Sequence, residues 1–293
     1  MIRSRNLSEF KLASIDLDGT LLGPAGQISQ ENRRAVQRLQ DAGLEVVLAS
    51  GRHYISMHRF VDALPGIRWL ISCQGGELST VDRTTVLTTE FLPAATVRET
   101  FDLGRSLGFT GVAYAADGVY TDSEWNSHLE FYAELSGTRP SECQSSQIFG
   151  RQIFKLIWMG NPGEIDQTAR QSPVDPTVIQ MVRTNARFLE FMPVAVSKAS
   201  ALKILAERLG VDPAATLAFG DGDNDVPMFE WAGVSVAMAH GWPAALRAAT
   251  HTSPAGPPDT ALARAIDCLF DASHLSAVQT ALAATIDGVA ART

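Results

Sequence analysis

Three short apolar segments alternate with two helical patterns near the start of the chain, and this alternation most constrains how it can fold. The segments at residues 12–15, 44–49 and 69–72 are typical of buried parallel strands. Residues 29–42 carry apolar side chains at helical spacing, and residues 53–63 are expected to form a second helix. Because parallel strands need a long crossover connection, usually a helix, this order predicts a βαβαβ unit.

The rhythm changes at about residue 84. Residues 84–190 read as runs of strands with occasional helices, including an expected hairpin at 109–121, which is typical of an α+β unit. Alternating helices and strands resume near residue 191 and end in two expected helices at 259–270 and 275–289. The sequence therefore predicts an α/β core formed by residues 1–83 and 191–293, with an α+β unit of residues 84–190 inserted into it. The first ten residues are expected to form a loose tail.

The charge balance argues against one broad class of partner. The chain has 293 residues, with 24 Lys and Arg against 32 Asp and Glu, for a formal net charge of −8. Since a basic surface is the usual footprint of nucleic-acid binding, no nucleic-acid partner is expected. An acidic protein that handles an anionic ligand needs a local positive group, such as a bound cation.

We expect a soluble cytoplasmic protein with no membrane partner. No stretch reaches about 18 consecutive apolar residues, and the first residues lack the apolar core of a secretion signal. The three cysteines, Cys73, Cys143 and Cys268, lie far apart, which rules out a disulfide framework or a four-cysteine zinc site. The sequence does not define the oligomeric state.

Polar clusters occur where expected strands end or helices begin. They lie at residues 16–20 (DLDGT), 50–52 (SGR), Lys198 and 220–225 (GDGDND). In open α/β sheets, ligands bind beyond the carboxyl ends of the strands. We therefore expect these clusters, although distant in sequence, to meet in one crevice.

The acidic clusters favour a magnesium site. Asp16 and Asp18 lie two residues apart at a strand end, so the strand period places both carboxylates on one side. With Asp221 from a second strand end they offer the oxygen ligands that suit Mg²⁺. An isolated D-x-D-G sequence is equally a simple turn, and the second strand end favours the metal site. An EF-hand calcium loop is excluded, because Val226 and Ala232 occupy the positions that need Gly and Glu.

Ser50, Gly51 and Arg52 come directly after a strand and open a helix, which is a ready site for an anion. Taken alone, Ser50 is equally well explained as an N-cap, and Arg52 could hold either a phosphate or a surface carboxylate. Asp225 begins another helix, where the helix dipole stabilises a carboxylate, so it could support the metal site rather than bind the metal directly.

With these motifs the chain resembles the haloacid dehalogenase-like (HAD) superfamily of phosphohydrolases, in its Cof-type branch. The D-x-D-G-T motif is met by residues 16–20, the second-motif serine by Ser50 within S-G-R, and the third-motif lysine by Lys198. The fourth motif, G-D-G-x-N-D, is met by residues 220–225, and residues 188–193 (FLEFMP) are similar to the segment where the chain leaves the branch's cap. The match covers nearly the whole chain, with the motifs in order.

The resemblance implies a Rossmann-like core of parallel strands with helices on both faces, and makes residues 84–190 a C2-type cap. Two positions depart from the usual pattern: Ala199 stands where a glycine commonly follows the lysine, and Gln74 lies close to a usual asparagine. Neither is an implied nucleophile or metal ligand, so the departures concern the positioning of the substrate.

The resemblance also implies a role for each motif residue. Asp16 is the expected nucleophile, and Asp18 the expected acid and base for the leaving group and for water. The implied Mg²⁺ ligands are the Asp16 carboxylate, the Asp18 backbone carbonyl and Asp221. The remaining implied site residues are the catalytic Lys198, the phosphate- or substrate-binding Ser50, Gly51, Arg52 and Asn224, and the supporting Asp225.

Together these features predict a Mg²⁺-dependent phosphatase, a phosphoric monoester hydrolase that acts through an aspartyl-phosphate on a small phosphorylated metabolite. A sugar phosphate is the leading substrate class. Two alternatives remain at this point: a phosphosugar mutase, which would pass the phosphoryl group to a second hydroxyl, and a regulator that binds a phosphorylated ligand without turnover. Cap aromatics such as Phe109, Tyr114, Tyr120 and Trp125 could line the pocket, although most are expected in the cap core.

Overall fold

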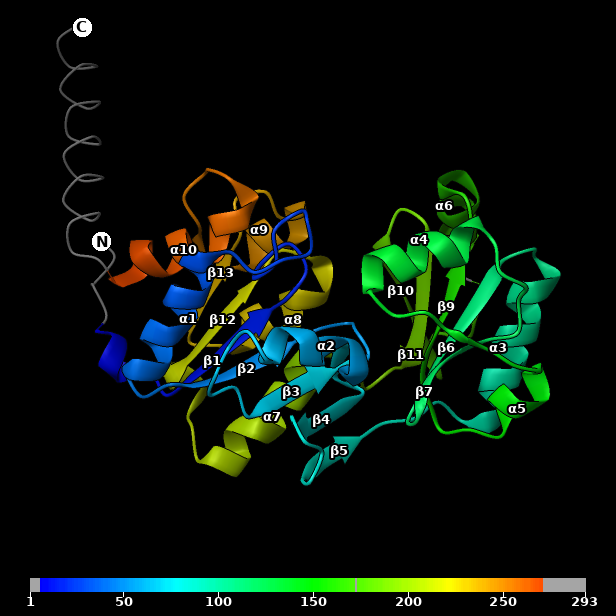
Figure 1. Ribbon diagram of the computed structural model, residues 1–293, viewed down its shortest axis with the longest axis horizontal. Coiled ribbons are helices and arrows are strands. Elements are labelled where there is room, and N and C mark those ends of the chain that lie inside the picture. Colours follow the sequence, from blue (N-terminus) through cyan, green and yellow to red (C-terminus); the bar gives the residue numbers. More distant parts are fainter. Residues whose placement is uncertain (1–5, 172, 271–293) are drawn as a thin grey trace, which may run out of the picture.

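The computed structural model describes residues 6–171 and 173–270, and these form two sheets that lie side by side with helices around each (Figure 1). The larger sheet has eight strands in the order β14-β13-β12-β1-β2-β3-β4-β5. Its first six strands in that order are parallel, and β4 and β5 are antiparallel additions at one edge. The bounds are β1 Leu12–Asp16, β2 Glu45–Ala49, β3 Trp69–Ser72, β4 Glu77–Thr80, β5 Val86–Thr89, β12 Thr216–Gly220, β13 Val234–Ala237 and β14 His251–Thr252.

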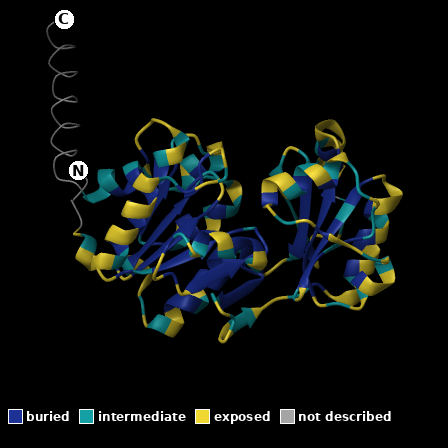
Figure 2. Cartoon of the chain, in the orientation of Figure 1, coloured by how far each residue is buried: buried dark blue, intermediate teal, exposed yellow. Residues whose placement is uncertain are grey.

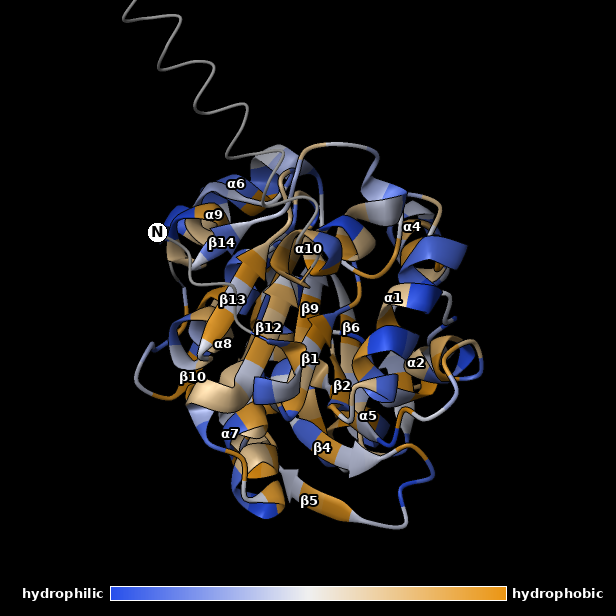
Figure 3. Cartoon of the chain, turned by 90° about the vertical axis from the view of Figure 1, so that its left-hand side faces the viewer, coloured by the Kyte–Doolittle hydropathy of each residue, from blue (hydrophilic) through white to orange (hydrophobic). Residues whose placement is uncertain are grey.

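Helices cover both faces of the large sheet because its central strands bury side chains on both sides. In β1, Ala13 and Ile15 join a core cluster with α1, α2 and α10, whereas Leu12 joins the opposite cluster with α7, α8 and α9. This division follows from the alternation of side chains along a strand. Figure 2 shows the strands buried beneath partly exposed helices, and Figure 3 shows the same strands as largely hydrophobic. The helices are α1 Gln30–Asp41, α2 Tyr54–Val61, α7 Lys198–Leu209, α8 Val226–Trp231, α9 Pro243–Ala248 and α10 Ala261–Phe270.

The smaller sheet has six strands in the order β10-β11-β9-β6-β7-β8, and every neighbouring pair except β7 and β8 is antiparallel. We call this sheet and its helices the cap. Helices α3, α5 and α6 pack on one face, and α4 packs on the face that also contacts Cys73 of the core. The bounds are β6 Thr110–Ala115, β7 Gly118–Thr121, β8 Ser141–Glu142, β9 Ile153–Met159, β10 Ile179–Asn185, β11 Phe188–Pro193, α3 Ala94–Ser106, α4 Ser127–Ser136, α5 Ser145–Phe149 and α6 Pro162–Gln171.

The predicted fold class is confirmed, but three details of the sequence prediction differ. Strand β5 (Val86–Thr89) pairs with β4 in the large sheet, although the inserted unit was expected to begin at residue 84. Strand β11 (Phe188–Pro193) stays in the cap sheet past residue 191, because it pairs with β9 and β10. Part of the expected tail is structured, since residues Leu7–Glu9 form a helical turn and Phe10 is buried against the core.

Two further predictions concern a helix near the end of the chain and the absence of a membrane-spanning helix. The expected helix at 275–289 lies outside the described residues. Within the residues that are described, no helix combines the length and the apolar character needed to cross a bilayer.

Candidate active site

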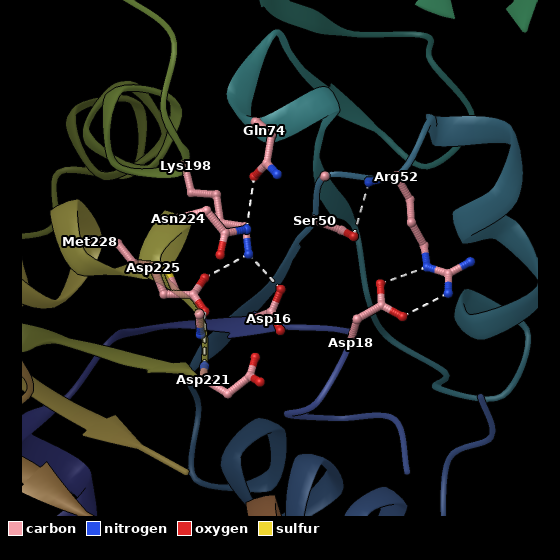
Figure 4. Close-up of polar contacts among 12 residues, drawn as sticks. Asp16, Asp18, Ser50, Arg52, Gln74, Lys198, Asp221, Asn224, Asp225 and Met228 are labelled. Atoms are coloured by element: carbon pink, nitrogen blue, oxygen red, sulfur yellow. Dashed lines mark hydrogen bonds and ion pairs between the residues drawn. The ribbon is translucent and has the colours of Figure 1, made fainter. Parts of the chain in front are cut away.

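Three carboxylates meet at the carboxyl edge of the large sheet. Asp16 ends β1 and Asp221 follows the neighbouring strand β12, because the two strands pair in parallel from Leu12 to Ile15. Carboxylate oxygens of Asp16, Asp221 and Asp225 lie within 4.8 Å of one another (Figure 4). Gly19 turns the chain close to them with φ +83°, and a Cβ added there would lie 2.3 Å from Asp221 Oδ2. Glycine therefore leaves the space that the Asp221 carboxylate fills.

Lys198 places one positive charge among these carboxylates. It begins α7, is buried, and donates hydrogen bonds from Nζ to Asp16 Oδ1 at 2.5 Å and to Asp225 Oδ1 at 2.6 Å. Burial by itself lowers the pKa of Lys198, but the two carboxylates more than offset this and raise its pKa above the ordinary value. Lys198 therefore stays charged beside the expected nucleophile.

The other oxygen of Asp225 is also occupied. Its Oδ2 accepts hydrogen bonds from the backbone N–H groups of Asp221 and Gly222, each at 2.9 Å. With Lys198 on Oδ1, this buried carboxylate holds the loop after β12 and the lysine together. The contacts favour the supporting part expected for Asp225 over direct binding of a metal.

Asp16 and Asp221 have the electrostatic character of a cation site. Burial raises the pKa of Asp16 well above its ordinary value, and burial together with the Asp225 charge raises the pKa of Asp221 to about 7. Asp16 Oδ2 is buried and, among the described residues, has no hydrogen-bond partner. One lysine does not neutralise three carboxylates, so the arrangement fits a bound divalent cation with oxygen ligands.

The Asp18 side chain lies apart from this cluster and pairs with Arg52 (Figure 4). Arg52 donates from Nε to Asp18 Oδ2 at 2.8 Å and from Nη2 to Asp18 Oδ1 at 2.7 Å. It also donates to two backbone carbonyls at the end of α4, those of Leu135 at 2.9 Å and Ser136 at 2.6 Å. These four contacts use four of the five N–H groups of a guanidinium. The described hydrogen bonds of the Arg52 side chain are therefore with a carboxylate and with the cap.

Ser50, Gly51 and Asn224 lie in the same region. Ser50 Oγ accepts the backbone N–H of Arg52 at 3.2 Å, so the serine caps the turn that it begins. Asn224 donates to Gln74 Oε1 at 3.0 Å, and a Cβ added at Gly51 would lie 2.5 Å from Gln74 Nε2. Gln74, the position noted as a departure, thus occupies the space between two of the predicted site residues.

A cavity of about 220 Å³ joins these residues to the cap. On the core side it is lined by Asp16, Asp18, Ser50, Asp221 and others. On the cap side, aromatic rings and polar side chains lie together: Tyr114, Tyr132, Phe188, Arg183, Thr184, Asn185 and Glu190. Of the cap aromatics singled out in the sequence, only Tyr114 lines this cavity, and Phe109 instead stacks on Trp158 in the cap core. The structure therefore brings the predicted clusters together under the cap.

A family model described as haloacid dehalogenase-like hydrolase matches residues 13–266. The chain belongs to this family. The resemblance drawn from the sequence motifs is thereby confirmed, and the protein is an enzyme of the haloacid dehalogenase-like hydrolases.

Individual relatives agree with this membership. A candidate phosphatase of Streptococcus pyogenes is 29% identical over 240 residues, which are 80% of this chain and 88% of that protein. A haloacid dehalogenase-like hydrolase from Bacteroides thetaiotaomicron has a similar structure, with a TM-score of 0.78, 26% identity, and coverage of 89% of this chain and 100% of that one. A sugar phosphatase of HAD subclass IIB has the same fold at 18% identity, with a TM-score of 0.78 and coverage of 88% and 98%.

Sequence reasoning missed one buried ion pair in this hydrolase. Lys155 of β9 donates from Nζ to Glu190 Oε2 at 2.7 Å and to the Gly51 carbonyl at 2.6 Å, so the cap reaches the predicted phosphate-binding turn. Thr184 Oγ1 donates to the other Glu190 oxygen at 2.9 Å. A charged residue within an otherwise apolar, fully buried strand (IFKLIWM) was the available signal.

Core side chains of the hydrolase also hold the cap through its backbone. His53 Nε2 lies 2.8 Å from the Ala115 carbonyl, and Arg83 Nη1 donates to the Ala116 carbonyl at 3.3 Å. Burial lowers the pKa of His53 to about 4, so at neutral pH the ring is uncharged and Nε2–H is the donor. With Arg52, these contacts make three core side chains that donate to cap carbonyls.

Proposed function

We propose that this chain is a Mg²⁺-dependent phosphoric monoester hydrolase that removes phosphate from a small phosphorylated metabolite through an aspartyl-phosphate on Asp16. The observation that carries the proposal is the environment of Asp16. Its carboxylate lines the cavity, one oxygen is held by Lys198, and the other is buried without a hydrogen-bond partner in the described part of the chain. Such a carboxylate is available to a metal and to a phosphorus atom.

We propose Asp16, Asp221 and the backbone carbonyl of Asp18 as the ligands of Mg²⁺. The acidic cluster and the raised pKa of Asp221 support this choice. A bound Mg²⁺ supplies positive charge that offsets the repulsion between the Asp16 carboxylate and the anionic phosphate.

The residues of the chain then divide the chemistry. Asp16 forms a bond to phosphorus as the bond between phosphorus and the leaving oxygen breaks, and Asp18 gives its proton to that oxygen. In the second half, Asp18 takes a proton from water, whose oxygen attacks phosphorus and releases phosphate and free Asp16. Lys198 holds Asp16 in place, while Ser50 and backbone N–H groups bind phosphoryl oxygens.

A sugar phosphate is the substrate class that the cavity favours. Its volume of about 220 Å³ is below the roughly 300–1,000 Å³ of sites for drug-sized ligands, which suits a single small ring. On the cap side, the polar groups of Glu190, Asn185 and Arg183 can bind the hydroxyl groups of a sugar. Aromatic rings beside them can contact the face of the sugar. The structural relative named as a sugar phosphatase supports the same choice.

The test is phosphate release from a panel of sugar phosphates and other phosphorylated metabolites, with Mg²⁺ and with EDTA. We expect release from one or a few compounds, and its loss with EDTA. Asp16→Asn should lower phosphate release on the order of 1,000-fold or more while keeping the thermal unfolding transition. Asp41→Asn, an exposed control on α1, should leave phosphate release unchanged. Full activity of Asp16→Asn would refute the proposal, and a hexose 6-phosphate formed from a hexose 1-phosphate without free phosphate would identify a mutase instead.

A further inference from the structure

Arg52 joins two parts of the molecule that must act together. Its guanidinium is buried, and it holds both oxygens of Asp18 while it donates to the Leu135 and Ser136 carbonyls of the cap. We infer that Arg52 is a positioning residue that fixes the Asp18 carboxylate for proton transfer when the cap covers the site. The inference rests on the proposed function of Asp18 as acid and base.

The Asp18 contact has the geometry of a positioning contact. Two parallel N–H···O bonds hold a carboxylate in the plane of the guanidinium, which a single contact does not do. The Asp18 side chain is 50% exposed although Arg52 is only 7% exposed, so a buried guanidinium holds a carboxylate that stays open toward the cavity. The contact thus fixes the position of Asp18 and leaves it accessible to a substrate.

The cap contact depends on where α4 ends. The last carbonyls of a helix have no partner within the helix and carry the negative end of its dipole. Leu135 and Ser136 lie in the last turn of α4, which ends at Gly137 with φ +69°. Arg52 supplies donors to two of these carbonyls, so seating the cap completes the coordination of the guanidinium, and lifting it removes those partners.

The fit between α4 and the core is close at this point. A Cβ added to Gly137 would lie 2.1 Å from Nη1 of Arg59 in α2, and the φ of +69° at Gly137 would strain an alanine. Gly137→Ala therefore disturbs the seating of the α4 end while leaving both Arg52 and Asp18 in the chain. It provides a second, independent perturbation of the same contact.

The test compares two leaving groups of similar size, benzyl phosphate and p-nitrophenyl phosphate. The benzyl alkoxide is a strong base and needs a proton as it leaves, whereas p-nitrophenolate leaves without one. We compare kcat/KM, which covers only the steps through transfer of phosphate to Asp16. Arg52→Lys keeps the charge but not the paired geometry. It should lower kcat/KM on the order of 100-fold for benzyl phosphate and less than about 5-fold for p-nitrophenyl phosphate.

A double-mutant cycle separates this inference from direct phosphate binding by Arg52. If Arg52 acts through Asp18, adding Arg52→Lys to Asp18→Asn should cause little further loss with either substrate. If Arg52 binds phosphate itself, the two losses multiply and are equal for both leaving groups, which overturns the inference. Gly137→Ala should show the same preference for the good leaving group as Arg52→Lys, and equal losses there also count against it.

The outcomes distinguish this inference from the proposed function. Wild-type protein that releases phosphate from neither ester, nor from any compound of the panel with Mg²⁺, refutes the proposed function and this inference with it. Wild-type release with equal losses in the variants refutes the inference alone. Thermal unfolding of each variant is measured beside the kinetics to show that the variant is folded. The leaving-group preference is a ratio of kcat/KM values within one variant, so it does not change with the amount of folded protein.

Discussion

Replacing Lys155 by Met should destabilise the protein strongly, although this residue lies outside the predicted catalytic set. The ammonium is 1% exposed and bonds to Glu190 at 2.7 Å and to the Gly51 carbonyl at 2.6 Å. Methionine fills a similar space without a charge. Of its hydrogen bonds with described side chains, Glu190 then keeps those with Thr184 at 2.9 Å and Gln74 at 3.4 Å, and both partners are uncharged.

The expected magnitude follows from the burial of both partners. Removing one member of a buried ion pair costs about 3–5 kcal/mol, because the remaining charge is left without compensation. At about 2–4 °C per kcal/mol, the midpoint of thermal unfolding should fall by roughly 6–20 °C. Lys155→Met/Glu190→Gln should recover part of this loss, since no unpaired charge remains. A residual cost of about 1–3 kcal/mol is expected because the Gly51 carbonyl has lost its donor.

The assay is thermal and urea unfolding followed by tryptophan fluorescence, with Lys203→Met as the control. Lys203 is exposed on α7, so its replacement should change the free energy of unfolding by no more than about 0.5 kcal/mol. The reasoning is wrong if Lys155→Met costs less than about 1 kcal/mol. It is also wrong if the double variant is as unstable as the sum of the two single variants, because that result would show no coupling between the charges.

Two further predictions concern the pH dependence of stability and the glycine beside the acidic cluster. Because the pKa of His53 is about 4 in the folded protein and about 6.5 when unfolded, His53 contributes stability that is present above pH 6.5 and lost as the pH falls to 4. The loss is about 3 kcal/mol at about 1.4 kcal/mol per pH unit, and urea unfolding across this range should show a flatter profile for His53→Gln; identical profiles would contradict the assignment. Gly19→Ala should lower kcat/KM on the order of 100-fold, because its Cβ would collide with the Asp221 carboxylate, and Gly26→Ala, also at positive φ but in open space, should cost stability alone. Equal activity of the two alanine variants would show that the collision is relieved without moving the carboxylate.

The core was predictable because its strands bury both faces. β1, β2 and β3 are short runs of apolar residues, and such runs leave few other structures open. β4 was missed because it carries Glu77, which is fully buried and paired with Arg83, so the strand does not read as apolar. Helix α4 was missed as well, since it buries only three of its ten residues.

The candidate site likewise has features that the sequence predicts and features that it does not. The meeting of Asp16 and Asp221 follows from parallel pairing, which places the ends of neighbouring strands together, and a sequence pattern can express that. The partners of Arg52 and Lys155 include backbone carbonyls, and every residue carries one. No residue type marks such an acceptor, so only the folded chain reveals the contact.

Arg52, His53 and Arg83 of the core all donate to main-chain oxygens of the cap, so the cap residues that they contact keep their side chains for other purposes. Leu135 and Ser136 offer their carbonyls to Arg52, and both residues also line the cavity. A hydrogen bond to a carbonyl is insensitive to the side chain beside it. Substitutions at these positions can therefore change the lining of the cavity while the hydrogen bonds between core and cap remain. A change in the compounds that bind in the cavity does not require new contacts between the two parts.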